Sequence, residues 1–299
     1  MIQGLDRSSR EFLQDLSRLK TRSEQAMRRI SSGYRVTRPS DDPASLSRIQ
    51  TVQASLERAT QVLANLNLIR TEVNTAEHAL GQAVQVMDRV IELGARGATS
   101  TATAESRAAA AIEVEGLLGR LVNLANTQIN GRYLFAGDAD QAQPFALDLA
   151  APEGVTAYAG AAATRQMEDV HGVRFSVARD GGVIFHVGAA SAFAAVNALR
   201  VALETNDEAA IQANMGALRS AGDHLNQHLA FYGFAQNRVS DATEGANQAG
   251  LVLRETLAAL RDADIVEAAV TLSQTRTHEE AAYSARARLP RSSLFDFLG

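Results

Sequence analysis

The stretch PASLSRIQTVQASLERATQVLANLNLIRTEVNTAEHALGQAVQVMDRVIEL, residues 43–93, decides the fold of this chain. Its apolar side chains recur every seven residues, which is the spacing of a helix that presents one narrow stripe to a partner helix. The recurring positions are Val52, Ala59, Leu66, Val73, Leu80 and Met87, with Ile49, Leu56 and Leu63 between them. At about 1.5 Å per residue this helix would be on the order of 75 Å long, which is too long for an ordinary compact domain.

The residues before this stretch predict a second helix with apolar side chains on the same seven-residue lattice. Ser31-Ser32-Gly33 ends that helix, and Ser40-Asp41-Asp42-Pro43 opens the long one, because small polar acceptors before a Pro are typical of a first helical turn. We therefore expect the carboxylates of Asp41 and Asp42 to cap the free amides of the long helix, or to meet Arg38 or an arginine of a neighbouring subunit.

The middle of the chain has a different pattern. A third helix is predicted after the Gly/Thr/Ser-rich turn at 94–103, and it should stop near Gly131. Residues 133–187 contain Gly pairs, Pro and short β-favouring runs at 173–177 and 183–187, with a hairpin signal at 179–182. Helical periodicity resumes at Ser191, and again at Asp207. This order indicates a small β-rich domain inserted between helices.

The predicted fold is mainly α with a β-rich inserted domain: an elongated, antiparallel helical rod with coiled-coil terminal helices. Its predicted parts are a coiled-coil segment at 1–37, rod at 38–137, the insert at 138–189, rod at 190–268 and a coiled-coil segment at 269–299. The apolar residues predicted to form an assembly seam are Leu5, Phe12, Leu16, Leu19, Ile30, Val239, Leu253, Leu260, Ile265, Leu272, Leu294 and Leu298. The residues predicted to form the helix-start signature are Arg38, Asp41, Asp42 and Pro43.

The composition of the chain excludes several classes of function and of chemical site. With 46% hydrophobic residues in 299 the chain has enough apolar material for a core, and its net charge of -5 argues against a nucleic acid as the main partner. The basic residues of the first forty positions alternate with acids, as on a solvated helix face. Because there is no Cys, disulfides and thiolate sites are excluded. No 18-residue apolar run and no secretory signal is present, so neither a membrane partner nor export by a cleaved signal peptide is expected.

Chemical motifs are few. His224 and His228 share a helix face at the spacing of zinc ligands, but Leu225 stands where a zincin needs its glutamate, so we expect a surface pair with no metal. A metal-dependent hydrolase built on this pair remains an alternative. Asp138-Ala139-Asp140 begins like a calcium loop but lacks its glycine and final glutamate, and Glu279-Glu280 is typical of a helix surface. No catalytic, cofactor-binding or metal-binding residue is therefore predicted.

Four segments carry a family resemblance. ISSGYRVTRPSDDPA at 30–44 resembles the N-terminal signature of flagellins and their relatives, and GFAQNRV at 233–239 resembles the start of their long C-terminal helix. NGRYLFAG at 130–137 is similar to a segment of hook-filament junction proteins, and SLFDFL at 293–298 to the terminal motif of the family. The chain is thus identified as a member of the flagellin superfamily, closest to the hook-associated protein 3 type. Thr37 stands where Asn is expected, and Pro290 interrupts the expected terminal helix.

The resemblance implies a structural protein of the bacterial flagellum that joins the hook complex to the filament, with no enzymatic activity and no cofactor. Its implied partners are further copies of the chain in a helical tube, a neighbouring hook-associated protein, flagellin and an export chaperone. It also implies an extracellular location reached through flagellar export, with terminal helices that pair only on assembly. A flagellin that forms the filament itself is the alternative, whereas a chemoreceptor-type bundle is disfavoured because a membrane span is missing.

Overall fold

The computed structural model describes residues 7–188 and 191–287, and side chains from residue 10 onward. The chain forms two compact units: unit 1 comprises residues 1–57 and 250–299, and unit 2 comprises residues 58–249. Two long helices, α2 (Pro43–Gly97) and α6 (Glu208–Arg261), contribute residues to both units. The long helix predicted from Pro43 is therefore confirmed, and it extends slightly beyond Leu93.

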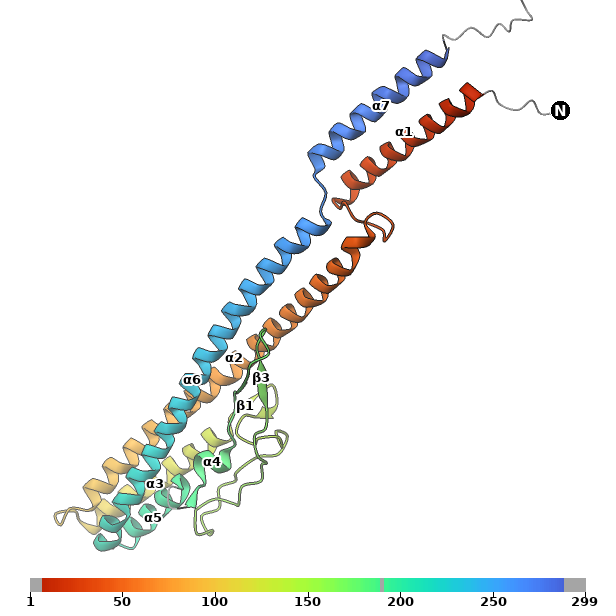
Figure 1. The fold of residues 1–299 in the computed structure, drawn as a ribbon. Helices are drawn as coiled ribbons and strands as arrows, with labels where there is room; N and C mark the ends of the chain where they lie inside the picture. Colours follow the sequence, from red (N-terminus) through yellow and green to blue (C-terminus); the bar gives the residue numbers. More distant parts are fainter. Residues whose placement is uncertain (1–6, 189–190, 288–299) are drawn as a thin grey trace, which may run out of the picture. The chain divides into compact units, whose positions relative to one another are not determined.

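Unit 1 is built from helices. α1 (Arg7–Ser32) packs against α7 (Ile265–Ala287), and the two lie side by side in Figure 1. Where α2 begins and α6 ends, Val36, Ile49 and Leu257 form a small buried apolar cluster. The predicted break after Ser32 is confirmed, because α1 ends there and Gly33 takes a φ of 75°, which a side chain would disfavour.

Unit 2 contains the main hydrophobic core. Within it α2 and α6 run antiparallel: Gly97 lies beside Ile211, whereas the amide of Gln236 donates to the side chain of Asn74 at 3.1 Å. Two shorter helices, α3 (Ala104–Ala125) and α5 (Ala192–Glu204), pack against each other. Of the heptad positions of α2 that fall in this unit, Leu66, Val73, Leu80 and Met87 are buried in the main core, and Ala59 is also buried.

Several helices begin or end at residues other than those predicted. α3 ends at Ala125 and not near Gly131, since Asn126 at its C-cap uses its side chain to bind the backbone of Phe145. α6 is a single helix from Glu208 to Arg261, so it does not begin near Gly233 as the family resemblance suggested. The predicted restarts at Ser191 and Asp207 are confirmed: Ser191 caps α5, and Asp207 accepts the amide of Ala210 in the first turn of α6.

The segment between α3 and α5 contains less β-structure than expected. The short strands β1 (Gln128–Ile129) and β2 (Arg132–Tyr133) form one antiparallel pair, and β3 (Gln166–Glu168) and β4 (Arg174–Ser176) form another. The hairpin predicted at 179–182 is wrong, and so is the strand predicted at 183–187. Asp180 accepts the amide of Val183 and caps the short helix α4 (Gly181–Phe185) instead, because an Asp before small residues also suits a helix start.

Aromatic packing compensates for the short strands. Phe135 meets Phe185 edge to face with ring centroids 5.6 Å apart, and Phe145 lies 4.9 Å from Phe193 of α5. All four side chains are buried. The hydroxyl of Tyr158 donates to the carbonyl of Phe135 at 2.9 Å. Residues 128–185 are therefore held in unit 2 by side chains that pack onto its helices more than by sheet hydrogen bonds.

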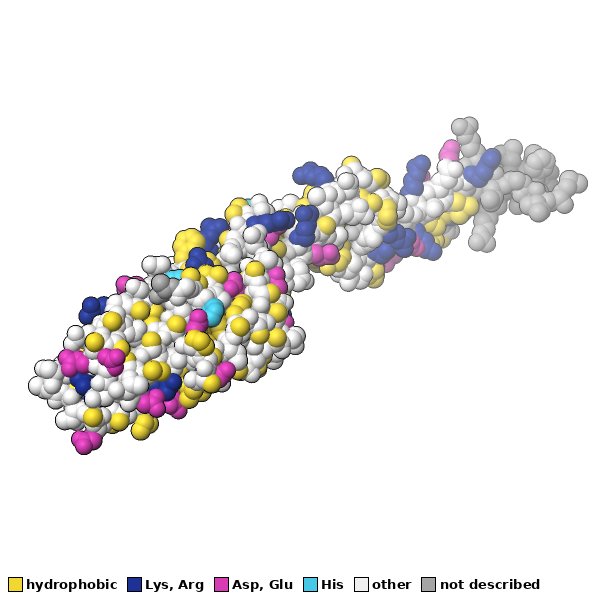
Figure 2. All heavy atoms as spheres, turned by 90° about the horizontal axis from the view of Figure 1, so that it is seen from below, with side chains coloured by type: hydrophobic (Ala, Val, Ile, Leu, Met, Phe, Trp, Pro, Cys, Tyr) yellow, Lys and Arg dark blue, Asp and Glu magenta, His cyan; other side chains and the backbone are white. Residues whose placement is uncertain are grey.

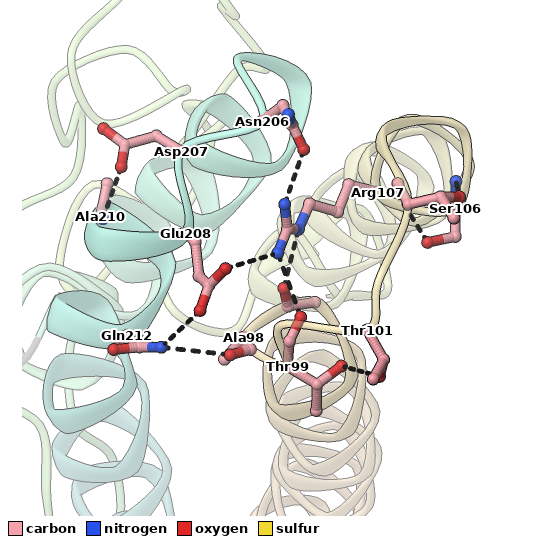
Figure 3. Close-up of polar contacts among 12 residues, drawn as sticks. Ala98, Thr99, Thr101, Ser106, Arg107, Asn206, Asp207, Glu208, Ala210 and Gln212 are labelled. Atoms are coloured by element: carbon pink, nitrogen blue, oxygen red, sulfur yellow. Dashed lines mark hydrogen bonds and ion pairs between the residues drawn. The ribbon is translucent and has the colours of Figure 1, made fainter.

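One end of unit 2 is fixed by Arg107 of α3 (Figure 3). Its guanidinium donates to the carbonyls of Gly97 at 2.9 Å and Thr99 at 3.1 Å, just where α2 ends. It also donates to the side chain of Asn206 at 2.7 Å, in the turn between α5 and α6, and to that of Glu208, the first residue of α6, at 3.2 Å. With 7% of its side chain exposed, Arg107 is a buried cation that joins three helix ends.

Candidate assembly interface

The pairing of α1 and α7 leaves much of both helices uncovered. On α1 the apolar side chains Phe12, Leu16, Leu19 and Ile30 are only half-buried, and Ala26 is buried. On α7, Ala268 and Thr275 are buried, Leu272 is half-buried and Ile265 is exposed. A pair of helices that contact through small or half-covered side chains buries little apolar area per residue, so its stability as an isolated pair is marginal.

Unit 1 also exposes large apolar side chains. Val266 is 74% exposed and Val270 is 51% exposed, one turn apart on the side of α7 that faces away from Ala268. Figure 2 shows apolar side chains at the surface, beside Lys and Arg, on the helices next to the grey terminal residues. The other large exposed apolar side chains in the described part of this unit are Leu13, Met27, Tyr34, Leu251, Val252, Ile265 and Tyr283. Apolar surface of this kind marks sites of protein-protein contact.

The loop between α1 and α2 is ordered by its two carboxylates. Asp42 accepts the amide of Ser45 at 3.1 Å and its hydroxyl at 2.6 Å, and it pairs with Arg35 at 3.0 Å. Asp42 therefore caps α2, and the Ser45 hydroxyl, followed by Arg35, lowers the pKa of its carboxyl group. Pro43 is the first residue of the helix.

Asp41 has a different role from the one expected. Its carboxylate accepts the backbone amides of Thr37 at 2.9 Å and Arg38 at 2.8 Å, and the hydroxyl of Thr37 at 2.9 Å. These bonds lower the pKa of Asp41 and close the loop on itself, so Asp41 does not cap α2. The contact with Arg38 is through its amide and not its guanidinium. Thr37, which stands in place of the expected Asn, supplies two of the three bonds.

The same loop is attached to the turn between α6 and α7. The amide of Arg35 donates to the carbonyl of Arg261 at 2.7 Å, and the guanidinium of Arg35 donates to the carbonyl of Leu260 at 2.8 Å. In return Ala263 donates its amide to the carbonyl of Gly33 at 2.9 Å, and Arg261 lies over the ring of Tyr34 at 3.9 Å. Arg35 thus connects the Asp42 cap, the loop and the end of α6, which fixes where α1 and α7 begin to pair.

Two family models match this sequence. The bacterial flagellin N-terminal helical region matches residues 8–140, and the bacterial flagellin C-terminal helical region matches residues 215–298. Together they cover more than half of the chain. The chain belongs to the flagellin family. The matched regions contain the α1–α2 loop and the α6–α7 turn just described.

Individual relatives of this flagellin-family chain fall into two groups. Flagellar hook-associated protein 3 of Salmonella typhimurium is 32% identical over 117 residues, which is 39% of this chain and 37% of that protein. Flagellin FlaB1 of Treponema pallidum is 24% identical over 276 residues, which is 90% of each chain. The first match thus spans well under half of the relative, whereas the second spans nearly all of it.

Solved structures share the fold. A putative flagellar hook-associated protein from Vibrio parahaemolyticus has a TM-score of 0.66 and 16% identity, over 74% of this chain and 99% of that one. Flagellar hook-associated protein 3 from Legionella pneumophila has a TM-score of 0.64 and 16% identity, over 71% and 98%. At this identity the likeness shows the fold alone, and it agrees with a mainly α, flagellin-like architecture.

The residues predicted to form the assembly seam of this flagellin-family chain lie in both units. In unit 2, Val239 is buried in the core and is therefore occupied within the chain itself. In unit 1, Leu253 and Leu260 of α6 are half-buried, as are the α1 residues Phe12, Leu16, Leu19 and Ile30. Leu5, Leu294, Leu298 and the Pro290 interruption lie outside the described residues. The role of the unit 1 seam in assembly stays a prediction.

One residue of the histidine pair of this flagellin-family chain, His228, is buried in the core, whereas His224 is half-buried. His228 is 2% exposed, so the expected surface pair was wrong for this residue. Its Nδ1 lies 3.1 Å from a guanidinium nitrogen of Arg179, and its Nε2 lies 3.2 Å from Nε2 of His224. Burial, followed by the neighbouring His224 and Arg179, lowers the pKa of His228 to about 4.

Metal binding does not fit this pair. A histidine that ligates a metal through Nε2 normally donates its Nδ1 proton to a carbonyl or carboxylate, whereas Arg179 requires Nδ1 of His228 to accept. Within residues 7–188 and 191–287, no group of three or more His, Cys, Asp or Glu is placed to hold a metal ion. The Asp138 carboxylate binds Thr164, and the Asp140 carboxylate pairs with Arg132, so both serve as loop contacts.

No described helix is both long and apolar enough to cross a bilayer.

The Glu279-Glu280 pair lies on α7, where Glu280 is exposed and Glu279 is half-buried. The side chains that order the α1–α2 loop act through hydrogen bonds and ion pairs within unit 1.

Proposed function

We propose that this chain is a structural subunit of the bacterial flagellum that joins the hook complex to the filament. The observation that carries the proposal is the uncovered apolar surface of α1 and α7, exemplified by Val266 and Val270. Copies that stack side by side would bury this surface, and many weak contacts of this kind stabilise an assembly that a single pair of helices cannot. The role is that of a subunit in an assembly and not that of an enzyme.

The hook-filament position in this proposal rests on the match to hook-associated protein 3 of Salmonella typhimurium, which is the more identical of the two relatives described. By the same reasoning, the neighbours would be a second hook-associated protein on one side and flagellin on the other, with an export chaperone before assembly. The protein would then lie outside the cell in the flagellum and reach it without a cleaved signal peptide.

The experiment is to locate the chain in isolated flagella with gold-labelled antibody and to delete its gene. A junction subunit appears as one short band between hook and filament, and its deletion leaves hooks that carry no filament. Label at the base of the hook or within the cell body, together with normal filaments after deletion, would overturn the proposal.

A filament subunit is the second candidate, because the match to flagellin FlaB1 of Treponema pallidum covers 90% of each chain. Purified chain added to short filament seeds separates the two possibilities. A filament subunit elongates the seeds continuously, whereas a junction subunit adds a short layer and stops. In the antibody experiment, the filament subunit would be labelled along the whole shaft.

A further inference from the structure

A basic hollow lies at the end of α1, beside the loop that Asp41 closes. Its volume is about 330 Å³, and its lining includes Arg28 and Arg29 of α1 together with Tyr34, Arg35 and Asp41 of the loop. All of these residues belong to unit 1. Most of the lining groups can donate hydrogen bonds, so the hollow is suited to an anionic group.

One cation in the hollow, Arg29, is uncommitted. Arg35 is used internally, since it binds Asp42 and the carbonyl of Leu260. The carboxylate of Asp41 is occupied by three bonds from Thr37 and Arg38. Among the residues that the structure describes, none makes a hydrogen bond or ion pair to the guanidinium of Arg28 or Arg29. The wall of the hollow therefore has one free guanidinium group, that of Arg29, and a second, that of Arg28, which lies close enough to the Asp41 carboxylate to lower the pKa of that group.

An uncommitted carboxylate lies on the other helix of unit 1. Glu267 of α7 is exposed, and its side chain has no hydrogen-bond or ion-pair partner among the described residues. The nearby acids are occupied: Asp262 pairs with Arg261 at 3.3 Å, and Asp264 accepts the amides of Val266 at 2.8 Å and Glu267 at 3.0 Å.

Glu267 also lies on the apolar surface that the proposed assembly would bury. It is next to Val266 along the chain, and it is one turn before Val270 on α7. A carboxylate that is carried into an interface without a partner loses its hydration and destabilises that interface. If Val266 and Val270 are covered by another copy, Glu267 needs a cation within that interface.

We infer that Glu267 of one copy enters the hollow of a second copy and pairs with Arg28 and Arg29 there. This contact rests on the proposed assembly and names a charge pair within it. If α7 of one copy shifted along α1 of the other, Glu267 would lose its cation or meet another carboxylate, and either outcome costs free energy. The pair therefore determines which part of α7 meets which part of α1. Met27, which is exposed and precedes Arg28 along α1, is an apolar side chain against which Val266 or Val270 of the other copy can pack.

A charge-swap series tests the contact in cells that carry the variant in place of the natural chain. Copies per isolated flagellum are measured by quantitative immunoblot. We expect R28E with R29E, and separately E267R, to lower incorporation by about tenfold or more, because each brings like charges together. The triple variant restores incorporation to at least about half of the natural level, since both signs are exchanged. E280R serves as the matched control, because Glu280 is another exposed acid of α7.

Crosslinking supplies a second measurement. The natural chain has no Cys, so R28C with E267C introduces the only thiols. Oxidation of isolated flagella should join copies of this double variant into ladders on a non-reducing gel, and R28C with E280C should not. Absence of ladders from flagella that contain the double variant, or failure of the triple variant to recover incorporation, would overturn the contact. Absence of the natural chain from flagella would overturn the proposed function itself, so the two failures are distinguishable.

Discussion

Replacing Arg107 by Ala removes the cation that joins the ends of α2, α3 and α6 in unit 2. Four acceptors lose their donor: the carbonyls of Gly97 and Thr99, the amide oxygen of Asn206 and the carboxylate of Glu208. The Arg107 side chain is 7% exposed, whereas that of Glu208 is 39% exposed. Water can therefore reach Glu208 after the substitution, and the larger loss comes from the carbonyls at the end of α2.

The magnitude follows from these contacts. Breaking a fully buried charge network costs about 3–5 kcal/mol. Because Glu208 can be rehydrated, we place the loss at the low end, about 3 kcal/mol in the free energy of unfolding of unit 2. For a unit of this size, such a loss corresponds to a Tm lower by roughly 6–12 °C. Arg107→Lys keeps the charge but cannot donate in all four directions, so we expect an intermediate loss.

Thermal and urea unfolding followed by circular dichroism measure the effect, with Arg96→Ala as the control. Arg96 is also near the end of α2, but its side chain is 69% exposed and it reaches Glu92 only at 4.0 Å. Its removal should change stability by less than about 0.5 kcal/mol. If Arg107→Ala costs no more than Arg96→Ala, the reasoning that assigns a joining role to the buried guanidinium is refuted.

Three further predictions concern other parts of the chain. Asp42 accepts the amide of Ser45, and Asp41 accepts the amides of Thr37 and Arg38, so each Asp→Ala substitution should speed hydrogen exchange at its own partner amides. If Asp42→Ala instead exposed the amides of Thr37 and Arg38, and Asp41→Ala that of Ser45, the assigned roles would be wrong. His228 has a folded pKa of about 4 against an ordinary value of 6.5, so the folded chain binds fewer protons than the unfolded one between these values. The stability that this residue contributes should thus be present above pH 6.5 and decline toward pH 4, and His228→Gln should flatten this part of the profile measured by urea unfolding. Gly137→Ala should destabilise unit 2 by roughly 3 kcal/mol or more, because Gly137 has a φ of 62° and a Cβ would lie 1.8 Å from the carbonyl oxygen of Ala161. Gly116 has open space around it in α3, so the control Gly116→Ala should stabilise the unit by about 0.5–1 kcal/mol. Similar Tm values for the two variants would argue against this difference.

The helical part of the fold could be read from local signals. Residues such as Leu66 and Met87 recur at a fixed spacing, and Asp42-Pro43 marks a helix start, because both patterns depend only on neighbours along one helix. Local sequence patterns did not predict the structure of residues 179–187 in the insert. Val183 to Val187 has strand propensity, yet residues 181–185 form α4, since Asp180 caps it and Ile184 and Phe185 are buried in the core of unit 2.

The candidate surface was predictable only in part. The loop at 33–43 was found from its sequence, but Arg35 was missed because its partners, Leu260 and Arg261, are more than two hundred positions away. Arg107 gave no signal either, since an arginine in an alanine-rich helix is typical of a solvated face. In the same way His228, spaced like a surface ligand, is covered by residues around Arg179 that come from the insert.

The sequence by itself determined the order and periodicity of the long helices, the loop that separates α1 from α2, and the family to which the chain belongs. Tertiary structure decided which polar side chains are buried, which of two adjacent carboxylates caps a helix, and how α4 replaces a strand. The physical reason is range: capping and heptad spacing act within a few residues, whereas burial and ion pairing depend on segments that only the fold brings together.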